Sequence, residues 1–172
     1  MTQLKSLSIY YDRDFSLTEL YKLNNLERLK ITTNVYENVT IDLKGIECFP
    51  LLKELYLENG KIKNMHLLTG VKTLEVLTLE YNFEEDNIDF LKGLLNLRKL
   101  TIYKSGHRTQ VMERQYYTDL DISPLRDLVK LELLDLRGFI VEDSLVADTL
   151  PSLKRFISWG NYMEADIDSS LR

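Results

Sequence analysis

The clearest structural signal in this chain is the stretch Leu52-Lys-Glu-Leu55-Tyr-Leu57-Glu-Asn-Gly-Lys-Ile62-Lys-Asn-Met65. Its first six residues follow the pattern Leu-x-x-Leu-x-Leu, which recurs along the chain with Ile allowed at the last place. The pattern begins at Leu4, Leu26, Leu52, Leu74, Leu97 and Leu131, with a decayed copy from Leu153. The steps between these starts are 22, 26, 22, 23, 34 and 22 residues. The sequence therefore predicts seven structural units of 22 residues, some of them carrying insertions.

Each unit combines two kinds of apolar spacing. Places 4 and 6 alternate with polar places, which predicts a short strand with one buried face. Places 14, 17 and 20 step by three, as in Met65, Leu68 and Val71, which predicts a short helix or 3₁₀ turn. A capping box is expected at Ser16-Leu-Thr-Glu19, and a helix start with Ser as N-cap at Ser123-Pro124.

A single unit cannot bury its apolar side, whereas stacked units can. The strands of such a stack would form one parallel sheet, with the helical turns on the opposite side. Because the helical side is wider, the stack should curve and the sheet should line its concave face. We therefore expect an α/β fold in which residues 1–172 form a single domain.

The quoted stretch resembles a leucine-rich repeat. The 22-residue period and the phrase Asp121-Ile-Ser-Pro-Leu-Arg-Asp-Leu128 are similar to the bacterial internalin-type class. This resemblance covers residues 4–171 and implies a right-handed solenoid of strands and short helical turns. The asparagine that the family carries at place 9 occurs at Asn34, Asn82 and Asn161, so the turns should be less regular than in the family. Because the fold serves many partners, the resemblance implies protein binding and leaves the partner open.

The residue inventory argues against several other functions. The 172 residues include 33 leucines but only two histidines and one cysteine, Cys48, so we expect no enzyme, no cofactor and no metal site. The formal net charge of -5 argues against nucleic acid as the partner. The N-terminal sequence contains no apolar signal segment, and no apolar run reaches 18 residues, so we expect a cytoplasmic protein without membrane contact.

Polar places of the strands predict where a partner would bind, because these side chains project from the sheet. Tyrosines and the single tryptophan gather there, and such residues dominate binding interfaces. Packing of aromatic residues along the strands is the alternative explanation. The protein-binding residues predicted from the strands and from the long insertion after the fifth strand are Tyr10, Tyr11, Glu54, Tyr56, Glu58, Glu80, Tyr81, Tyr103, Arg137, Trp159, Tyr116 and Tyr117.

Carboxylates are concentrated on the outward face around the third and fourth units, with only Lys53 near them on that face. They are Glu54, Glu58, Glu75, Glu80, Glu84, Glu85 and Asp86. An acidic centre beside tyrosines favours a protein partner with a basic surface. The specific hypothesis is a cytoplasmic immunity protein that sequesters a basic toxin, for example a nuclease.

Two other functions remain open at this point. One is an internalin-like adhesin or secreted effector that binds a host protein. The other is a scaffold that self-assembles, or a homodimer that forms, through the uncapped edge of the first strand near Leu4.

Overall fold

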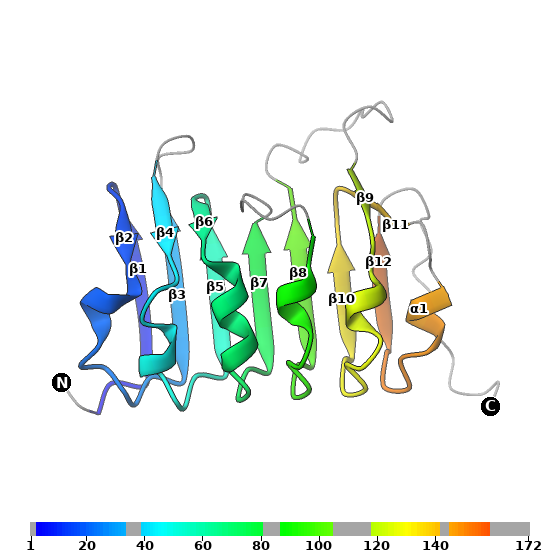
Figure 1. Ribbon diagram of the computed structural model, residues 1–172, viewed down its shortest axis with the longest axis horizontal. Coiled ribbons are helices and arrows are strands. Elements are labelled where there is room, and N and C mark those ends of the chain that lie inside the picture. The colour runs from blue at the N-terminus through cyan, green and yellow to red at the C-terminus, as the bar shows by residue number, and fades with distance from the viewer. Residues whose placement is uncertain (1–2, 34–38, 81–86, 105–117, 142–144, 159–172) are drawn as a thin grey trace.

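The computed structural model describes residues 3–33, 39–80, 87–104, 118–141 and 145–158. One strand from each unit joins a seven-stranded parallel sheet in the order β1-β3-β5-β7-β8-β10-β12 (Figure 1). These strands are β1 (Ser6–Tyr11), β3 (Arg28–Thr33), β5 (Glu54–Glu58), β7 (Val76–Glu80), β8 (Lys99–Tyr103), β10 (Leu133–Leu136) and β12 (Arg155–Ser158). Every one of them begins two residues after the start of a predicted hexad.

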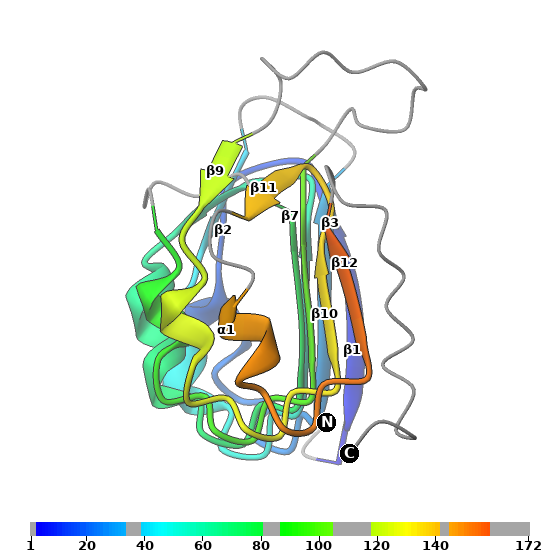
Figure 2. The same cartoon turned by 90° about the vertical axis from the view of Figure 1, so that its right-hand side faces the viewer.

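The other side of each coil is made of short helical turns and very short strands (Figure 2). The turns are η1 (Leu17–Leu20), η2 (Ile46–Cys48), η3 (Met65–Gly70), η4 (Asp89–Leu91), η6 (Ser123–Leu125) and α1 (Leu145–Asp148). A second parallel sheet in the order β2-β4-β6 contains β2 (Phe15–Ser16), β4 (Thr40–Asp42) and β6 (Lys61–Lys63). A separate pair is formed by β9 (Thr118–Leu120) and β11 (Phe139–Val141). The predicted alternation of strand and 3₁₀ turn is confirmed.

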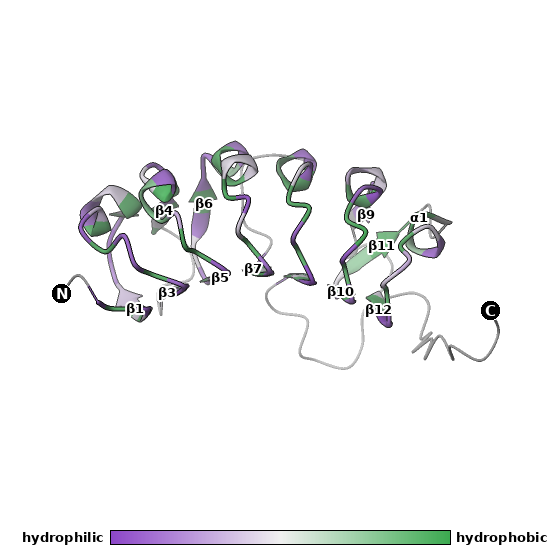
Figure 3. Ribbon diagram, turned by 90° about the horizontal axis from the view of Figure 1, so that it is seen from below, coloured by the Kyte–Doolittle hydropathy of each residue, from purple (hydrophilic) through white to green (hydrophobic). Residues whose placement is uncertain are grey.

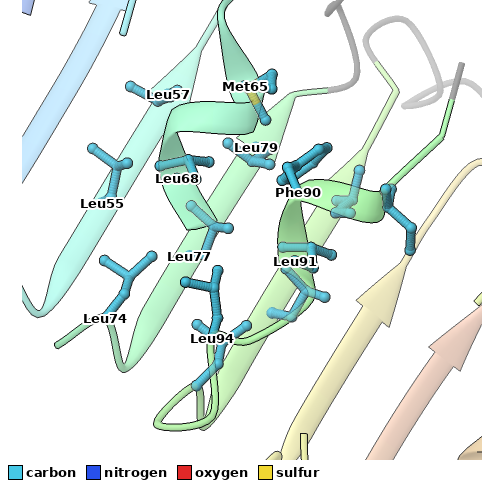
Figure 4. Packing of buried hydrophobic residues seen from close by; sticks show 14 of the residues in the cluster. Leu55, Leu57, Met65, Leu68, Leu74, Leu77, Leu79, Phe90, Leu91 and Leu94 are labelled. Atoms are coloured by element: carbon cyan, nitrogen blue, oxygen red, sulfur yellow. The ribbon is translucent and has the colours of Figure 1, made fainter. Parts of the chain in front are cut away.

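The core is a single cluster that fills the space between the sheet and the helical turns. Leu55 and Leu57 of β5 are fully buried, as are Met65 and Leu68 of η3 opposite them (Figure 4). Leucines at the same place in successive units therefore stack directly on one another. Because no unit can bury these side chains alone, the strand register and the core depend on each other.

Capping explains how two of the turns begin. The Ser16–Glu19 capping box is present, and Ser16 Oγ accepts a hydrogen bond from the Thr18 amide at 3.4 Å. The expectation for Ser123 was wrong, because Ile122 is the N-cap and η6 starts at Ser123 itself. Asp121 instead accepts hydrogen bonds from the amide and the hydroxyl of Ser123, at 2.8 and 2.9 Å.

Viewed from the ends of its strands, the sheet bows toward the helical turns (Figure 3). Its outer face is therefore concave, as the unit geometry predicted. The long insertion predicted after the fifth strand, residues 105–117, lies outside the described residues.

Candidate protein-binding surface

The concave face consists of rows of side chains that run across the strands. Places 3, 5 and 7 point outward because they alternate with the buried residues at places 4 and 6. The strand register sets equal places opposite each other, so the row at place 3 is Ser6, Arg28, Glu54, Val76, Lys99, Leu133 and Arg155. The row at place 5 is Ser8, Lys30, Tyr56, Thr78, Thr101, Asp135 and Ile157.

Charges on β3 and β5 satisfy one another. Arg28 donates two hydrogen bonds to the carboxylate of Glu54, at 2.7 and 2.8 Å, and the Tyr56 hydroxyl donates a third at 2.8 Å. These bonds, led by the one from Arg28, hold the pKa of Glu54 below its ordinary value. We call the outward residues of these two strands the paired patch: Arg28, Lys30, Thr32, Glu54, Tyr56 and Glu58.

Glu58 is paired in the same way. Its carboxylate lies 2.8 Å from the amine of Lys30 and accepts a hydrogen bond from the Thr32 hydroxyl at 3.2 Å. Glu54 and Glu58, two members of the predicted acidic centre, are therefore each balanced by a cation from the neighbouring strand β3. Glu84, Glu85 and Asp86 lie outside the described residues.

Tyr11 does not belong to the concave face, contrary to the prediction. It stands at place 8, which shares its direction with places 4 and 6, so its side chain enters the core and is only 8% exposed. Its hydroxyl has no hydrogen-bond partner in the described part of the chain, and burial is the main cause that raises its pKa. A methyl group built on Gly60 would collide with this hydroxyl, so a larger residue there would force Tyr11 to shift.

Glu80 also fails as an exposed binding residue, although it stands at an outward place. Its side chain is 3% exposed because its carboxylate turns to accept a hydrogen bond from the amide of Asn59. Asn59 has a left-handed backbone with φ 61° in the turn that follows β5. Burial raises the pKa of Glu80, and the charge of Glu58 adds to the effect. Glu80 therefore fastens the turn of one unit to the next.

The remaining predicted residues differ in exposure. Tyr10 is 69% exposed on β1, and Tyr56 and Tyr103 are half-buried on β5 and β8. Arg137 is exposed and holds Asp135 through two contacts of 2.9 Å. The predicted residues that lie outside the described part of the chain are Tyr81, Trp159, Tyr116 and Tyr117.

A second region of the concave face lies over β7, β8, β10 and β12. We call its residues the open patch: Val76, Thr78, Lys99, Thr101, Leu133, Arg155 and Ile157. Lys99 and Arg155 are exposed, while the apolar Val76, Leu133 and Ile157 are each partly exposed. The predicted list of binding residues missed all of these positions because it favoured tyrosines and carboxylates. Apolar residues at outward places 3 and 5 were the signal that could have identified them.

A further pattern at place 2 was also missed. Charges alternate in sign along the whole stack, in the order Lys5, Glu27, Lys53, Glu75, Arg98, Glu132 and Lys154. Glu27 pairs with Lys5 at 2.8 Å and with Lys53 at 3.3 Å. Glu132 pairs with Arg98 and, at 2.9 Å, with Lys154. This ladder follows the rim where the strands begin, and it favours the correct unit-to-unit register.

The described residues contain no cluster of three or more His, Cys, Asp or Glu side chains that could hold a metal ion. Among the described helices, none has the length and apolar composition needed to cross a membrane.

Solved structures with a similar course of the chain include two internalins of Listeria monocytogenes. An internalin (inlF) aligns over 90% of this chain with a TM-score of 0.65 and 19% identity. Internalin C2 aligns over 89% of it with a TM-score of 0.64 and 23% identity. The chain has the leucine-rich-repeat fold. This leucine-rich-repeat solenoid spans 42% of the inlF chain and 60% of the internalin C2 chain. No family model and no curated protein sequence matches it.

Proposed function

We propose that this leucine-rich-repeat protein is a non-enzymatic module that binds another protein on its concave face. One observation carries the proposal: partly exposed apolar side chains stand on a curved sheet face, at outward places where polar residues would serve solubility equally well. Val76, Leu133 and Ile157 are the residues concerned. The fold supports the proposal, because solenoid curvature creates the extended surfaces that such proteins use for binding.

The experiment is affinity capture of partners by the full chain, compared with capture by Leu133→Asp. The control variant is Val129→Asp, which changes an apolar residue that is 50% exposed but lies outside the sheet. A partner retained by the wild type and by Val129→Asp but lost by Leu133→Asp supports the proposal. A partner retained equally by all three proteins contradicts it.

A narrower form of the proposal makes the partner a toxin, neutralised in the cytoplasm by an immunity protein. The small size and the net charge of -5 support this form. The hypothesis that the toxin has a basic surface also relied on exposed carboxylates of the concave face. That support is weakened, because Glu54 and Glu58 are already paired and Glu80 is buried. The protein encoded by the neighbouring gene provides the test: a stoichiometric complex that abolishes its toxicity supports this form, and absence of binding contradicts it.

The internalin-like adhesin or secreted effector is a second candidate, favoured by the similarity to two internalin structures. Cell fractionation separates it from the cytoplasmic proposal. Protein found in the medium or on the cell surface supports the adhesin, and protein confined to the cytoplasm excludes it.

Self-assembly in a head-to-tail stack has less support. The ladder at place 2 begins with Lys5 and ends with Lys154, so stacking two copies in register would set these two amines opposite each other. Light scattering of the pure protein tests this: a mass that rises with concentration would favour the scaffold or a homodimer through the edge of β1.

A further inference from the structure

Apolar and basic side chains follow a regular order across the strands of the open patch. Along the row at place 3, apolar and basic residues alternate in the order Val76, Lys99, Leu133 and Arg155. Neighbouring strands lie about 4.8 Å apart, so residues of one kind recur roughly every 10 Å. A surface of this kind can hold apolar and acidic side chains of one partner segment side by side.

The described carboxylates on these four strands do not occupy Lys99. Glu80 is 3% exposed and occupied by the Asn59 amide, and Asp135 is 6% exposed and occupied by Arg137. Lys99 forms no ion pair with any carboxylate among the described residues, although its charge helps to lower the pKa of Glu54. Among the described residues, the open patch therefore presents the exposed amine of Lys99 between apolar side chains, in a chain whose net charge is -5.

The paired patch is less able to bind a carboxylate of a partner. A partner carboxylate could reach Arg28 only by displacing Glu54, which is held by two hydrogen bonds. Removing one member of such a pair leaves the other charge unsatisfied at an interface, which is costly. A new ligand for a cation is thus accepted more readily by Lys99 than by Arg28.

From these observations we infer that the open patch binds an acidic protein segment in which carboxylates stand among apolar side chains. This inference rests on the proposed function, that the concave face binds protein, and it names the chemistry of the partner. Carboxylates of the segment pair with Lys99, and its apolar side chains cover Val76, Leu133 and Ile157. A nucleic acid would leave these apolar residues facing phosphates and is disfavoured.

The test is selection of a random 12-residue peptide library on the purified full chain. The enriched peptides are then titrated against the wild type, Lys99→Glu, Tyr10→Ala and Lys22→Glu by fluorescence anisotropy at low and high salt. Tyr10→Ala is a control at the other end of the concave face, and Lys22→Glu is a charge control on the helical side. Circular dichroism verifies the fold of each variant, and Lys99→Gln provides a milder change. A labelled single-stranded DNA is titrated in parallel.

The inference predicts that enriched peptides carry net negative charge and apolar residues. Their affinity should fall at least about tenfold in Lys99→Glu and less in Lys99→Gln, while both control variants bind as the wild type. Enrichment of basic peptides, sensitivity to Tyr10→Ala alone, or tighter binding of DNA overturns the inference and leaves concave-face binding standing. No enrichment, or peptides insensitive to Lys99 and Tyr10 alike, overturns the proposed function as well.

Discussion

Two neighbouring regions of one sheet face are built on the same repeat but differ in how their charges are used. In the paired patch, each outward carboxylate meets a cation from the next strand, as Glu54 meets Arg28. On the strands of the open patch, the carboxylates Glu80 and Asp135 are buried, and the cation Lys99 projects between apolar neighbours. The repeat therefore sets the shape of both regions. The residues at three outward places determine whether the charges of a region pair with one another or are available to a partner.

The largest effect is expected at the tightest contact beneath the β1–β5 side of the sheet. Gly60→Ala would place a methyl group against the buried Tyr11 hydroxyl, with too little room for both. We expect a loss of about 1–3 kcal/mol in the free energy of unfolding, as for other overpacked cores. Chemical denaturation measures it, and the double variant with Tyr11→Phe should recover part of the loss because the two changes share one contact. Equal losses with and without Tyr11→Phe would show that the hydroxyl is not the obstacle.

Leu133→Asp should break the open patch without breaking the fold. We expect affinity for a selected partner peptide to fall by about tenfold or more, because a carboxylate replaces an apolar contact and faces the acidic segment. The matched control is Val129→Asp, at a residue of 50% exposure that follows η6. Isothermal titration checks the result, and an equal loss in the two variants would contradict a specific role for the patch.

Tyr56→Phe should weaken the paired patch by a smaller amount. It removes the hydrogen bond of 2.8 Å to Glu54, and a typical hydrogen bond contributes about 0.5–1.5 kcal/mol to the free energy of unfolding. Tyr10→Phe is the control, since its exposed hydroxyl should change stability by less than about 0.5 kcal/mol. Peptide affinity should be unchanged in both variants. Weaker binding by Tyr56→Phe would show that the partner contacts the paired patch and not the open patch.

The smallest effect concerns pH, and the two regions should differ in sign. Glu80 has a pKa raised above 4.5, so between this value and the raised one the folded chain holds more protons than the unfolded chain. Its ionisation therefore costs stability as pH rises through that window. Glu54 has a lowered pKa and contributes stability that is lost as pH falls through the lowered value.

Glu80→Gln should consequently be more stable than the wild type at pH 7, because the amide oxygen can still accept the Asn59 bond. Glu54→Gln should be less stable at pH 7. Both differences should shrink toward acidic pH in thermal unfolding series. A destabilised Glu80→Gln at pH 7 would mean that the carboxylate charge is favourable where it is buried.

The fold followed from the sequence because leucine spacing alone determines which residues can be buried together. Each strand of the sheet starts at the third place of a hexad, and the buried Leu17 and Leu68 stand at the predicted places 14 and 17 of their units. Side-chain direction at place 8 was misassigned at Tyr11, although strand alternation already required it to face inward.

The binding surface was harder to predict because its electrostatics depend on neighbours that are distant in sequence. Arg28 and Glu54 are 26 residues apart, yet they are adjacent because both stand at place 3. Aligning the units place by place would have shown this pair. No such alignment could have shown that Glu80 turns to the Asn59 amide, since that depends on the left-handed turn after β5.

Methyl NMR of the full chain during titration with a selected peptide would show directly whether the partner binds on the open patch. We expect the largest shift changes at the methyl groups of Val76, Leu133 and Ile157. The exposed methyl groups of Leu51, Leu95 and Val129, which lie outside the sheet, should remain unchanged. Shifts concentrated on these latter residues, with Val76, Leu133 and Ile157 unmoved, would contradict it.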